Sequence, residues 1–166
     1  MRKLLAIWLG KILTIVGKTV GKKSSSSPGA YALKICPDLV KCLEKCVSKG
    51  IIVTCGTNGK TTTNNLMASA LEAKGYKVIC NKLGANMLSG IATTVLQEMS
   101  IFGKLKADYA CLEIDEAYTP IVFDYVKPDV MVITNLFRDQ LDRYGEKLKP
   151  GRNFSFSQTA MSGDSA

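Results

Sequence analysis

Short apolar runs alternate with polar and glycine-containing segments along the middle of the chain. The runs at 51–55, 107–114 and 129–134 have the length and composition of strands that are buried in a sheet. A helix is predicted from the polar segment after the first run to about Lys74, and a short helix is predicted within 32–49. Strands that alternate with helices predict an α/β fold, in which helices flank a mostly parallel sheet.

The first 21 residues are also apolar, but lysines interrupt them. On a helical wheel, one narrow face collects Lys11, Thr14, Lys18 and Lys22, and large apolar residues cover the rest. A membrane-spanning helix needs about 20 nearly uncharged residues. The pattern instead predicts, for residues 1–23, an amphipathic helix that lies in a membrane interface with its lysines toward anionic head groups. A helix packed against the protein's own body and a secretory signal cleaved near 30–32 are the alternatives.

Composition narrows the domain organisation and the function classes. The 166 residues suit one folded domain, and the serine-rich residues 24–31 predict a flexible linker before it. Much of the formal charge of +8 lies in the N-terminal arm, and aromatic residues do not interleave with basic ones, so no nucleic-acid partner is expected. The absence of histidine leaves Lys, Asp, Glu and bound metal for any catalysis. The six cysteines are expected to be reduced thiols, with a zinc or disulfide role for Cys42 and Cys46 as the alternative.

The strongest chemical signal is the segment 56–62, Gly-Thr-Asn-Gly-Lys-Thr-Thr, which connects the first predicted strand to a helix. In such a segment, backbone N–H groups and the positive end of the helix converge on phosphate. Gly56 and Gly59 permit the turn, the catalytic Lys60 is expected to reach the outer phosphates, and Thr61 to offer its hydroxyl to Mg²⁺. The predicted ATP-binding residues of this loop are Gly56, Thr57, Asn58, Gly59, Lys60, Thr61 and Thr62.

Carboxylates follow the predicted strand at 107–114, namely Glu113, Asp115 and Glu116. At the carboxyl end of a strand in an open α/β sheet, such groups face the ligand crevice. We therefore predict that Glu113 is a catalytic residue and a Mg²⁺ ligand that opposes Thr61 across the nucleotide. A solvated acidic turn is the alternative.

Two motifs carry a resemblance to a known family. Thr54 stands where the general Walker pattern has its first glycine, and the shorter G-T-N-G-K-T-T resembles the phosphate loop of the Mur ligases and of their folylpolyglutamate synthetase relatives. The run N-L-F-R-D-Q-L-D-R-Y-G-E at 135–146 resembles the Mur ligase segment N-x-x-x-D-H-L-D. Together with 81–86 and 90–93, this run is similar to the MurT group of that family.

The resemblance implies further site residues in the second motif. Asn135, Asp139 and Arg143 are expected to contribute to ATP binding. Gln140 replaces the histidine that helps to hold a second metal ion in the family, which makes Gln140 a doubtful metal ligand. The fold implied is the central, ATP-binding domain of a Mur ligase, with ATP and Mg²⁺ as cofactors.

The MurT resemblance also implies a reaction and partners. MurT enzymes are ATP-dependent carbon–nitrogen ligases of peptidoglycan biosynthesis, which amidate the D-glutamate α-carboxylate of lipid II through an acyl phosphate. Ammonia comes from a glutamine amidotransferase subunit, GatD. The expected partners are thus a GatD-like subunit, lipid II and the inner face of the cell membrane. A peptide-adding Mur ligase or folylpolyglutamate synthetase-like ligase, and a non-catalytic nucleotide-binding module, are the alternatives.

The expected organisation is incomplete relative to that family. Residues 32–149 are predicted to form part of a central domain, and the polar, small-residue-rich segment 150–166 a disordered tail. Family members continue through a zinc-binding cysteine ribbon and a C-terminal domain, and this sequence holds neither. The chain alone is therefore expected to be inactive in amidation, with a parallel sheet that lacks strands.

Overall fold

A computed structural model describes residues 2–19, 26–81 and 86–135 of the chain. Within these ranges, four strands form one sheet in the order β2-β3-β1-β4, and each pairing is parallel. The strands are β1 (Val47–Cys55), β2 (Val78–Cys80), β3 (Ala107–Glu113) and β4 (Val130–Ile133). The predicted α/β fold with a mostly parallel sheet is thereby confirmed.

The connections that follow the two central strands, β1 and β3, run in opposite directions across the sheet. From β1 the chain crosses to the edge strand β2 on the side of β3, and from β3 it crosses to β4 on the other side of β1. In open α/β sheets, the carboxyl ends of strands at such a reversal border a ligand crevice. The ends of β1 and β3 lie side by side there, because Thr54 is in register with Glu113.

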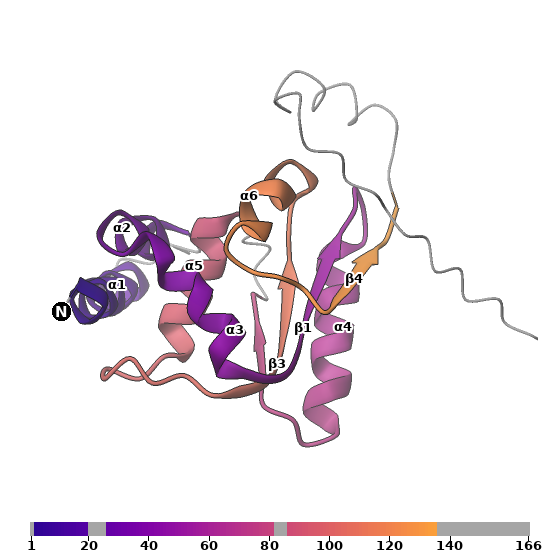
Figure 1. The fold of residues 1–166 in the computed structure, drawn as a ribbon, viewed down its shortest axis with the longest axis horizontal. Coiled ribbons are helices and arrows are strands. Elements are labelled where there is room, and N and C mark those ends of the chain that lie inside the picture. Colours follow the sequence, from indigo (N-terminus) through magenta and orange to yellow (C-terminus); the bar gives the residue numbers. More distant parts are fainter. Residues whose placement is uncertain (1, 20–25, 82–85, 136–166) are drawn as a thin grey trace, which may run out of the picture.

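Helices cover both faces of the sheet (Figure 1). On one face lies α4 (Lys60–Ala73), and on the other lie α5 (Leu88–Glu98), α2 (Ser27–Ile35) and, outermost, α1 (Arg2–Thr19). Short helical turns complete the described chain: η1 (Pro37–Cys42), α3 (Leu43–Cys46), η2 (Glu116–Tyr118) and α6 (Thr119–Phe123). The core contains Val53 and Leu112 of the sheet with Ile91, Val95 and Leu96 of α5, all fully buried.

The flexible linker predicted over 24–31 is wrong for residues 27–31, because they form the first turns of α2. Serine, proline and glycine indicate a linker by composition, but here Pro28 lies in the first turn of a helix and Gly29 allows close contact with α5. The Gly29 N–H donates to Thr93 Oγ1 at 2.9 Å, and a Cβ at Gly29 would lie 2.0 Å from the carbonyl oxygen of Ser89. Residues 24 and 25 lie outside the described residues.

The N-terminal helix predicted over 1–23 is present over Arg2–Thr19 as α1, and it packs against α2 and α5, while residues 1 and 20–23 lie outside the described residues. Its inner face consists of the buried residues Ala6, Ile7 and Gly10. A Cβ at Gly10 would lie 2.5 Å from Leu96 Cδ1, so the glycine allows this close approach. The alternative of packing against the protein's own body is thus confirmed for this face, while large apolar side chains of α1 point outward. Within the described ranges, no helix is both long enough and apolar enough to cross a bilayer.

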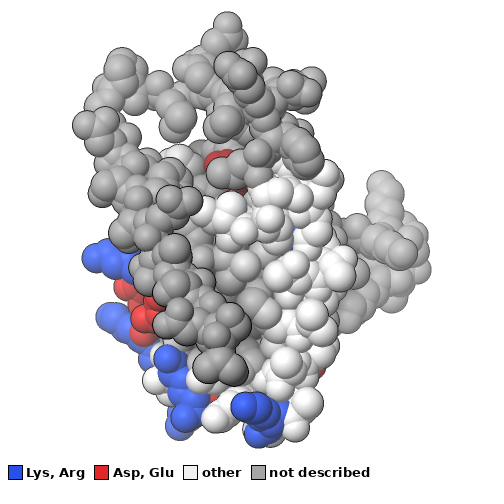
Figure 2. All heavy atoms as spheres, turned by 90° about the vertical axis from the view of Figure 1, so that its right-hand side faces the viewer, with Lys and Arg blue, Asp and Glu red and all other residues white. Residues whose placement is uncertain are grey.

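The α4 side lies at the opposite end of the long axis from α1 (Figure 1). Figure 2 looks onto this side, where the described surface is largely uncharged and basic side chains gather toward one end, with acidic side chains among them. Of its 14 residues, α4 has only Lys60 and Glu72 as charged residues. Leu66 of α4 is 69% exposed. Leu66 is therefore an exposed apolar residue that is remote from α1.

Candidate nucleotide-binding site

The loop between β1 and α4 adopts a conformation that depends on its two glycines. Gly56 has φ +131° and Gly59 has φ +79°, in the region that residues with a Cβ rarely adopt. A Cβ at Gly56 would lie 2.2 Å from Thr134 Oγ1 and 2.7 Å from the carbonyl oxygen of Asn135. A Cβ at Gly59 would meet nothing within 4 Å. Gly56 is therefore required by space and by backbone conformation, and Gly59 by conformation alone.

The residues that follow β4 hold this loop in place. The N–H of Thr57 donates to the carbonyl oxygen of Asn135 at 2.9 Å, and the N–H of Asn58 donates to Asn135 Oδ1 at 2.8 Å. Thr134 Oγ1 donates to the carbonyl oxygen of Asn58 at 2.7 Å. The structure thus brings the predicted site residue Asn135 to the loop, where its main chain and side chain both support the turn.

Lys60 is the first residue of α4, and its ammonium group turns back over the loop. Nζ donates to the carbonyl oxygens of Gly56 and Thr57, the second at 3.2 Å, and lies 3.7 Å from Glu116 Oε2. The side chains of Lys60 and Glu116 are both mostly buried. The N-terminal end of α4 adds the positive end of the helix dipole at the same place. A cation and a helix N-terminus therefore converge where phosphate binding is predicted.

Glu113 ends β3 beside this loop and is only 3% exposed. In the described part of the chain, Glu113 Oε2 and Glu116 Oε1 are buried side-chain oxygens without a hydrogen-bond partner. A solvated acidic turn is therefore the wrong interpretation of these two side chains. Burying a carboxyl oxygen without a partner is costly, and such an oxygen favours a nearby cation. The orphaned oxygen of Glu113 thus fits the predicted Mg²⁺ ligand.

A buried polar network, which the sequence did not reveal, fixes Glu113 relative to α4. Asn81 Nδ2 donates to the carbonyl oxygen of Glu113, and the N–H of Glu113 donates to Asn81 Oδ1, both at 2.8 Å. Asn64 of α4 joins them, because its Nδ2 donates to Asn81 Oδ1 at 3.4 Å and to the carbonyl oxygen of Cys111 at 3.3 Å. Thr54 Oγ1 donates to Asn64 Oδ1 at 3.4 Å. These hydrogen bonds thereby link α4, β1 and β3 behind the loop.

Replacing Asn81 with alanine is expected to lower the free energy of unfolding by about 2–4 kcal/mol, because two main-chain groups of Glu113 lose their partners in a buried place. Asn65→Ala is the matched control: its side chain accepts a weak bond from Cys80 Sγ at 3.7 Å, and its removal is expected to cost less than about 1 kcal/mol. Denaturant unfolding followed by circular dichroism measures both. Equal losses in the two variants would contradict this role of Asn81.

Cys55, the last residue of β1, borders the same cluster. Burial raises the pKa of its thiol to about 11, with Glu116 raising the pKa further and Lys60 opposing the rise. The thiol is therefore protonated at neutral pH and acts as a packing residue. All six cysteines are free thiols, and the described residues contain no group of three or more His, Cys, Asp or Glu side chains placed to hold a metal ion. A Mg²⁺ ion that is bound together with a nucleotide needs only one or two protein ligands, because the phosphates supply further ligands.

The remaining predicted site residues divide into two groups. Thr61 and Thr62 lie in the first turn of α4 and are exposed, so their hydroxyl groups are accessible at the loop. Asp139, Gln140 and Arg143 lie outside the described residues, and their predicted roles stay predictions.

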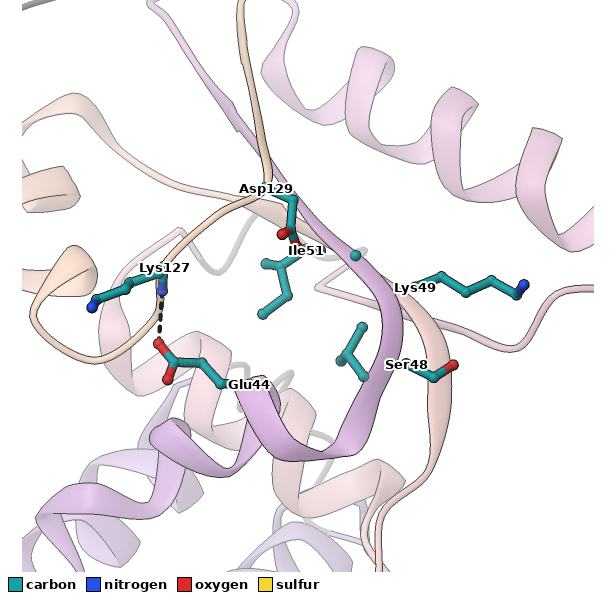
Figure 3. Close-up of a pocket in the computed structure, with 8 residues that line it drawn as sticks. Glu44, Ser48, Lys49, Ile51, Lys127 and Asp129 are labelled. Carbon is teal, nitrogen blue, oxygen red and sulfur yellow. Dashed lines mark hydrogen bonds between the residues drawn. The ribbon is translucent and has the colours of Figure 1, made fainter.

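A separate cavity of about 290 Å³ opens at the amino end of β1, far along the strand from the loop (Figure 3). Its carboxylates are occupied by main-chain donors. Asp129 Oδ2 accepts from the N–H of Ile51 at 2.7 Å, and Glu44 Oε1 accepts from the N–H of Lys127 at 3.0 Å. These contacts fix the residues at the start of β4 against β1 and α3, so we assign this cavity a structural role.

Comparison with known proteins decides the family. Residues 53–149 match the family model of the Mur ligase middle domain. The chain belongs to the Mur ligase family. The matched range contains the loop, Glu113 and Asn135, which are the residues that the geometry gathers at one edge of the sheet. Members of this family are ligases that generally use ATP and Mg²⁺.

Individual relatives point to one group within the Mur ligases. The chain is 40% identical over 146 residues to the lipid II isoglutaminyl synthase (glutamine-hydrolyzing) subunit MurT of Staphylococcus aureus, which covers 88% of this chain and 32% of that relative. The MurT subunit of Streptococcus pneumoniae is 44% identical over 124 residues, 75% of this chain and 27% of that relative. A UDP-N-acetylmuramoylalanine–D-glutamate ligase of Oleidesulfovibrio alaskensis is 30% identical over 102 residues, 61% of this chain and 22% of that relative.

Two conclusions follow from these identities. The resemblance to the MurT group, predicted from 81–86, 90–93 and 135–146, is confirmed. The chain spans about a third or less of the length of the curated relatives it matches, since it covers 32%, 27% and 22% of them.

Proposed function

We propose that this chain supplies the ATP-binding part of an enzyme that amidates the α-carboxylate of D-glutamate in lipid II. The observation that carries the proposal is the position of Lys60, which folds back over the glycine loop after β1, together with the buried oxygen of Glu113 at the end of the neighbouring strand β3. The identity to MurT subunits favours amidation over peptide addition, because it is higher and covers more of the chain than the identity to the D-glutamate ligase.

Each site residue has a role in the proposed phosphoryl transfer. The Lys60 ammonium would pair with the outer phosphates of ATP, while the Gly56–Gly59 turn brings backbone close to them. Glu113 and Thr61 would hold Mg²⁺, which supplies positive charge to the transferred phosphoryl group. Asn135 and Thr134 keep the loop in shape through the bonds that they make to it. Lys60 thereby stabilises charge where it develops in the transition state.

The proposed reaction has two steps. A carboxylate oxygen of D-glutamate attacks the γ-phosphorus of ATP and forms an acyl phosphate, while the bond from that phosphorus to the β–γ bridging oxygen breaks and ADP leaves. Ammonia then attacks the acyl carbon, the bond from that carbon to the phosphate oxygen breaks, and the nitrogen loses a proton as phosphate departs. A GatD-like glutaminase would supply the ammonia by hydrolysing glutamine to glutamate. The MurT relatives are named as one subunit of a glutamine-hydrolyzing synthase, which supports a partner of this kind.

The proposed location is the cytoplasmic face of the cell membrane, where the lipid-linked substrate and ATP would meet. Residues 1–23 would serve as the membrane-interface arm, 32–149 as part of the nucleotide domain, and 150–166 as a tail. Because the chain spans only part of its relatives' length, we propose that it does not amidate lipid II by itself, even when mixed with the glutaminase.

The test is nucleotide titration with the 166-residue chain. We expect ATP to bind in the presence of Mg²⁺, and Lys60→Ala to weaken binding about tenfold to a hundredfold, because a charge-assisted contact to phosphate is worth about 1.5–3 kcal/mol. Lys74→Ala is the matched control, since Lys74 is exposed beyond the other end of α4. Binding that is unchanged in Lys60→Ala, or equally weakened in Lys74→Ala, would contradict the proposed function.

A further inference from the structure

α1 turns its large apolar residues away from the protein. Its inner face is made of Ala6, Ile7 and Gly10, whereas Leu5, Trp8, Ile12 and Ile15 are exposed. Successive residues of an α-helix are rotated by about 100°, so these exposed positions lie opposite the buried ones. A helix that served packing alone would direct its largest apolar stripe toward the core. The orientation of α1 therefore indicates an apolar contact outside this chain.

A tight turn between α5 and β3 extends the same surface. The N–H of Gly103 donates to the carbonyl oxygen of Ser100 at 2.9 Å, and the N–H of Lys104 donates to Ser100 Oγ at 3.0 Å. These bonds hold Ile101 and Phe102 at the tip of the turn, where Phe102 is 74% exposed. Two aromatic or branched apolar side chains at an exposed tip are costly in water unless something covers them.

The turn is seated directly on α1. Trp8 Nε1 donates to the carbonyl oxygen of Ile101 at 2.9 Å, although the two residues are 93 positions apart in the chain. A Cβ at Gly103 would lie 3.1 Å from Ile7 Cδ1 and 3.8 Å from Leu4 Cδ2, so only a glycine fits comfortably there. The two elements thus form one surface, which we call the apolar platform: Leu5, Trp8, Ile12, Ile15, Ile101 and Phe102.

The segments of the sequence that contain the apolar platform are rich in basic residues. The first 37 residues contain no Asp or Glu, but they contain Arg2, Lys3, Lys11, Lys18, Lys22, Lys23 and Lys34. Lys104 and Lys106 follow the turn and are exposed, with Glu98 of α5 as an acidic residue before it. Two copies of so basic a face would repel one another, which disfavours self-association. Apolar residues with tryptophan, bordered by lysines, match the interface of an anionic lipid bilayer.

We propose that the apolar platform is a docking surface for an anionic lipid bilayer, in which α1 lies in the interface and the tip of the 100–103 turn inserts beside it. The proposal rests on the membrane location proposed above and adds the turn, the orientation of α1 and the residues that touch lipid. The small inner face of α1 remains on α2 and α5, so docking leaves the contacts of the helix with the body intact.

The test uses the 166-residue chain and vesicles without ATP or lipid II, so its outcome is independent of nucleotide binding and amidation. We expect binding to vesicles of phosphatidylcholine and phosphatidylglycerol at 3:1, and much weaker binding to phosphatidylcholine alone. Trp8 is the only tryptophan, so its fluorescence reports on the platform directly. Its emission is expected to shift to shorter wavelength and to be quenched by lipids with brominated acyl chains.

Two exposed platform residues and a remote one give matched variants. Phe102→Ser and Ile12→Ser are each expected to lower the partition coefficient at least about tenfold, because each removes an apolar side chain from the lipid contact. Leu66→Ser, at a comparably exposed position on α4, is expected to leave it unchanged. Lys104→Gln with Lys106→Gln is expected to weaken binding about fivefold per charge. Circular dichroism and thermal unfolding check that these exposed substitutions leave the fold intact.

Three results would overturn the proposal. The first is wild-type protein that does not bind the anionic vesicles. The second is a Leu66→Ser loss equal to that of Phe102→Ser. The third is a concentration-dependent dimer that Phe102→Ser dissociates while vesicle binding stays absent, which would make the platform a contact between copies of the chain.

Discussion

Replacing Gly56 with alanine is expected to lower the free energy of unfolding by about 4 kcal/mol and to abolish nucleotide binding, since overpacking and backbone strain each cost about 1–3 kcal/mol. The new methyl group would lie 2.2 Å from Thr134 Oγ1 and 2.7 Å from the carbonyl oxygen of Asn135. Relief of this overlap requires movement of the residues that bind Thr57 and Asn58, so the loop loses the bonds that shape it. Denaturant unfolding and ATP titration with Mg²⁺ measure the two effects.

Alanine variants of two other glycines distinguish the cost of backbone strain from the cost of steric overlap. Gly59 has φ +79° and Gly75 has φ +84°, and a Cβ at either position meets nothing within 4 Å. Alanine at each is therefore expected to cost only about 1–2 kcal/mol from backbone strain. Gly75→Ala lies beyond α4 and is expected to leave ATP binding unchanged. If Gly56→Ala were no more destabilised than Gly75→Ala, the close packing of Thr134 and Asn135 against the loop would be wrong.

The loop and its flanking elements could be predicted from the sequence because their signals are local. Gly56, Gly59 and Lys60 stand in a fixed spacing between an apolar strand and a helix, and each local preference agrees with the others. The end of β3 was predictable for the same reason, since Glu113 follows an apolar run directly. Asn135 was predicted to bind ATP from the resemblance alone, and its hydrogen bond to the loop is a contact that only the structure shows.

Other parts of the site depend on the pairing of strands that are distant in the chain, which no local sequence pattern predicts. β2 has only three residues, Val78–Cys80, which is too short for a periodicity. The bonds between Asn81 and Glu113 follow from the parallel register of β2 and β3, in which Cys80 pairs with Cys111. Asn64 is a polar residue within a helix, and only the tertiary fold buries it. Long-range pairing therefore builds the support behind the loop, while local sequence builds the loop.

The orientation of α1 also escaped prediction, for a different reason. A helical wheel gives the distribution of apolar residues but not which part of the stripe faces the body. Close packing at Gly10 fixes the orientation, because a Cβ there would already lie 2.5 Å from Leu96 Cδ1 of α5. The larger residues were left on the outside, and there they meet the 100–103 turn.

Replacing Glu113 with glutamine is expected to remove the Mg²⁺-dependent part of ATP affinity. Glutamine keeps the length of the side chain, and the two bonds with Asn81 use main-chain groups of residue 113, so the end of β3 stays in place. The loss is expected to be at least about tenfold, because even the outer partners of metal ligands contribute about 10–100-fold to metal affinity. ATP titrations with and without Mg²⁺ measure the difference.

The comparison between Glu113→Gln and Lys60→Ala distinguishes a metal ligand from a phosphate contact. The ammonium of Lys60 acts on phosphate directly, so Lys60→Ala is expected to weaken ATP binding with and without Mg²⁺, whereas Glu113→Gln weakens it only when Mg²⁺ is present. Glu98→Gln, at an exposed position of α5, is the control for removal of a negative charge. An equal loss for Glu113→Gln in the absence of Mg²⁺ would show that Glu113 shapes the loop instead of holding a metal. The orphaned Oε2 of Glu113 argues for the metal, because a purely structural carboxyl in so buried a position would have both oxygens hydrogen-bonded.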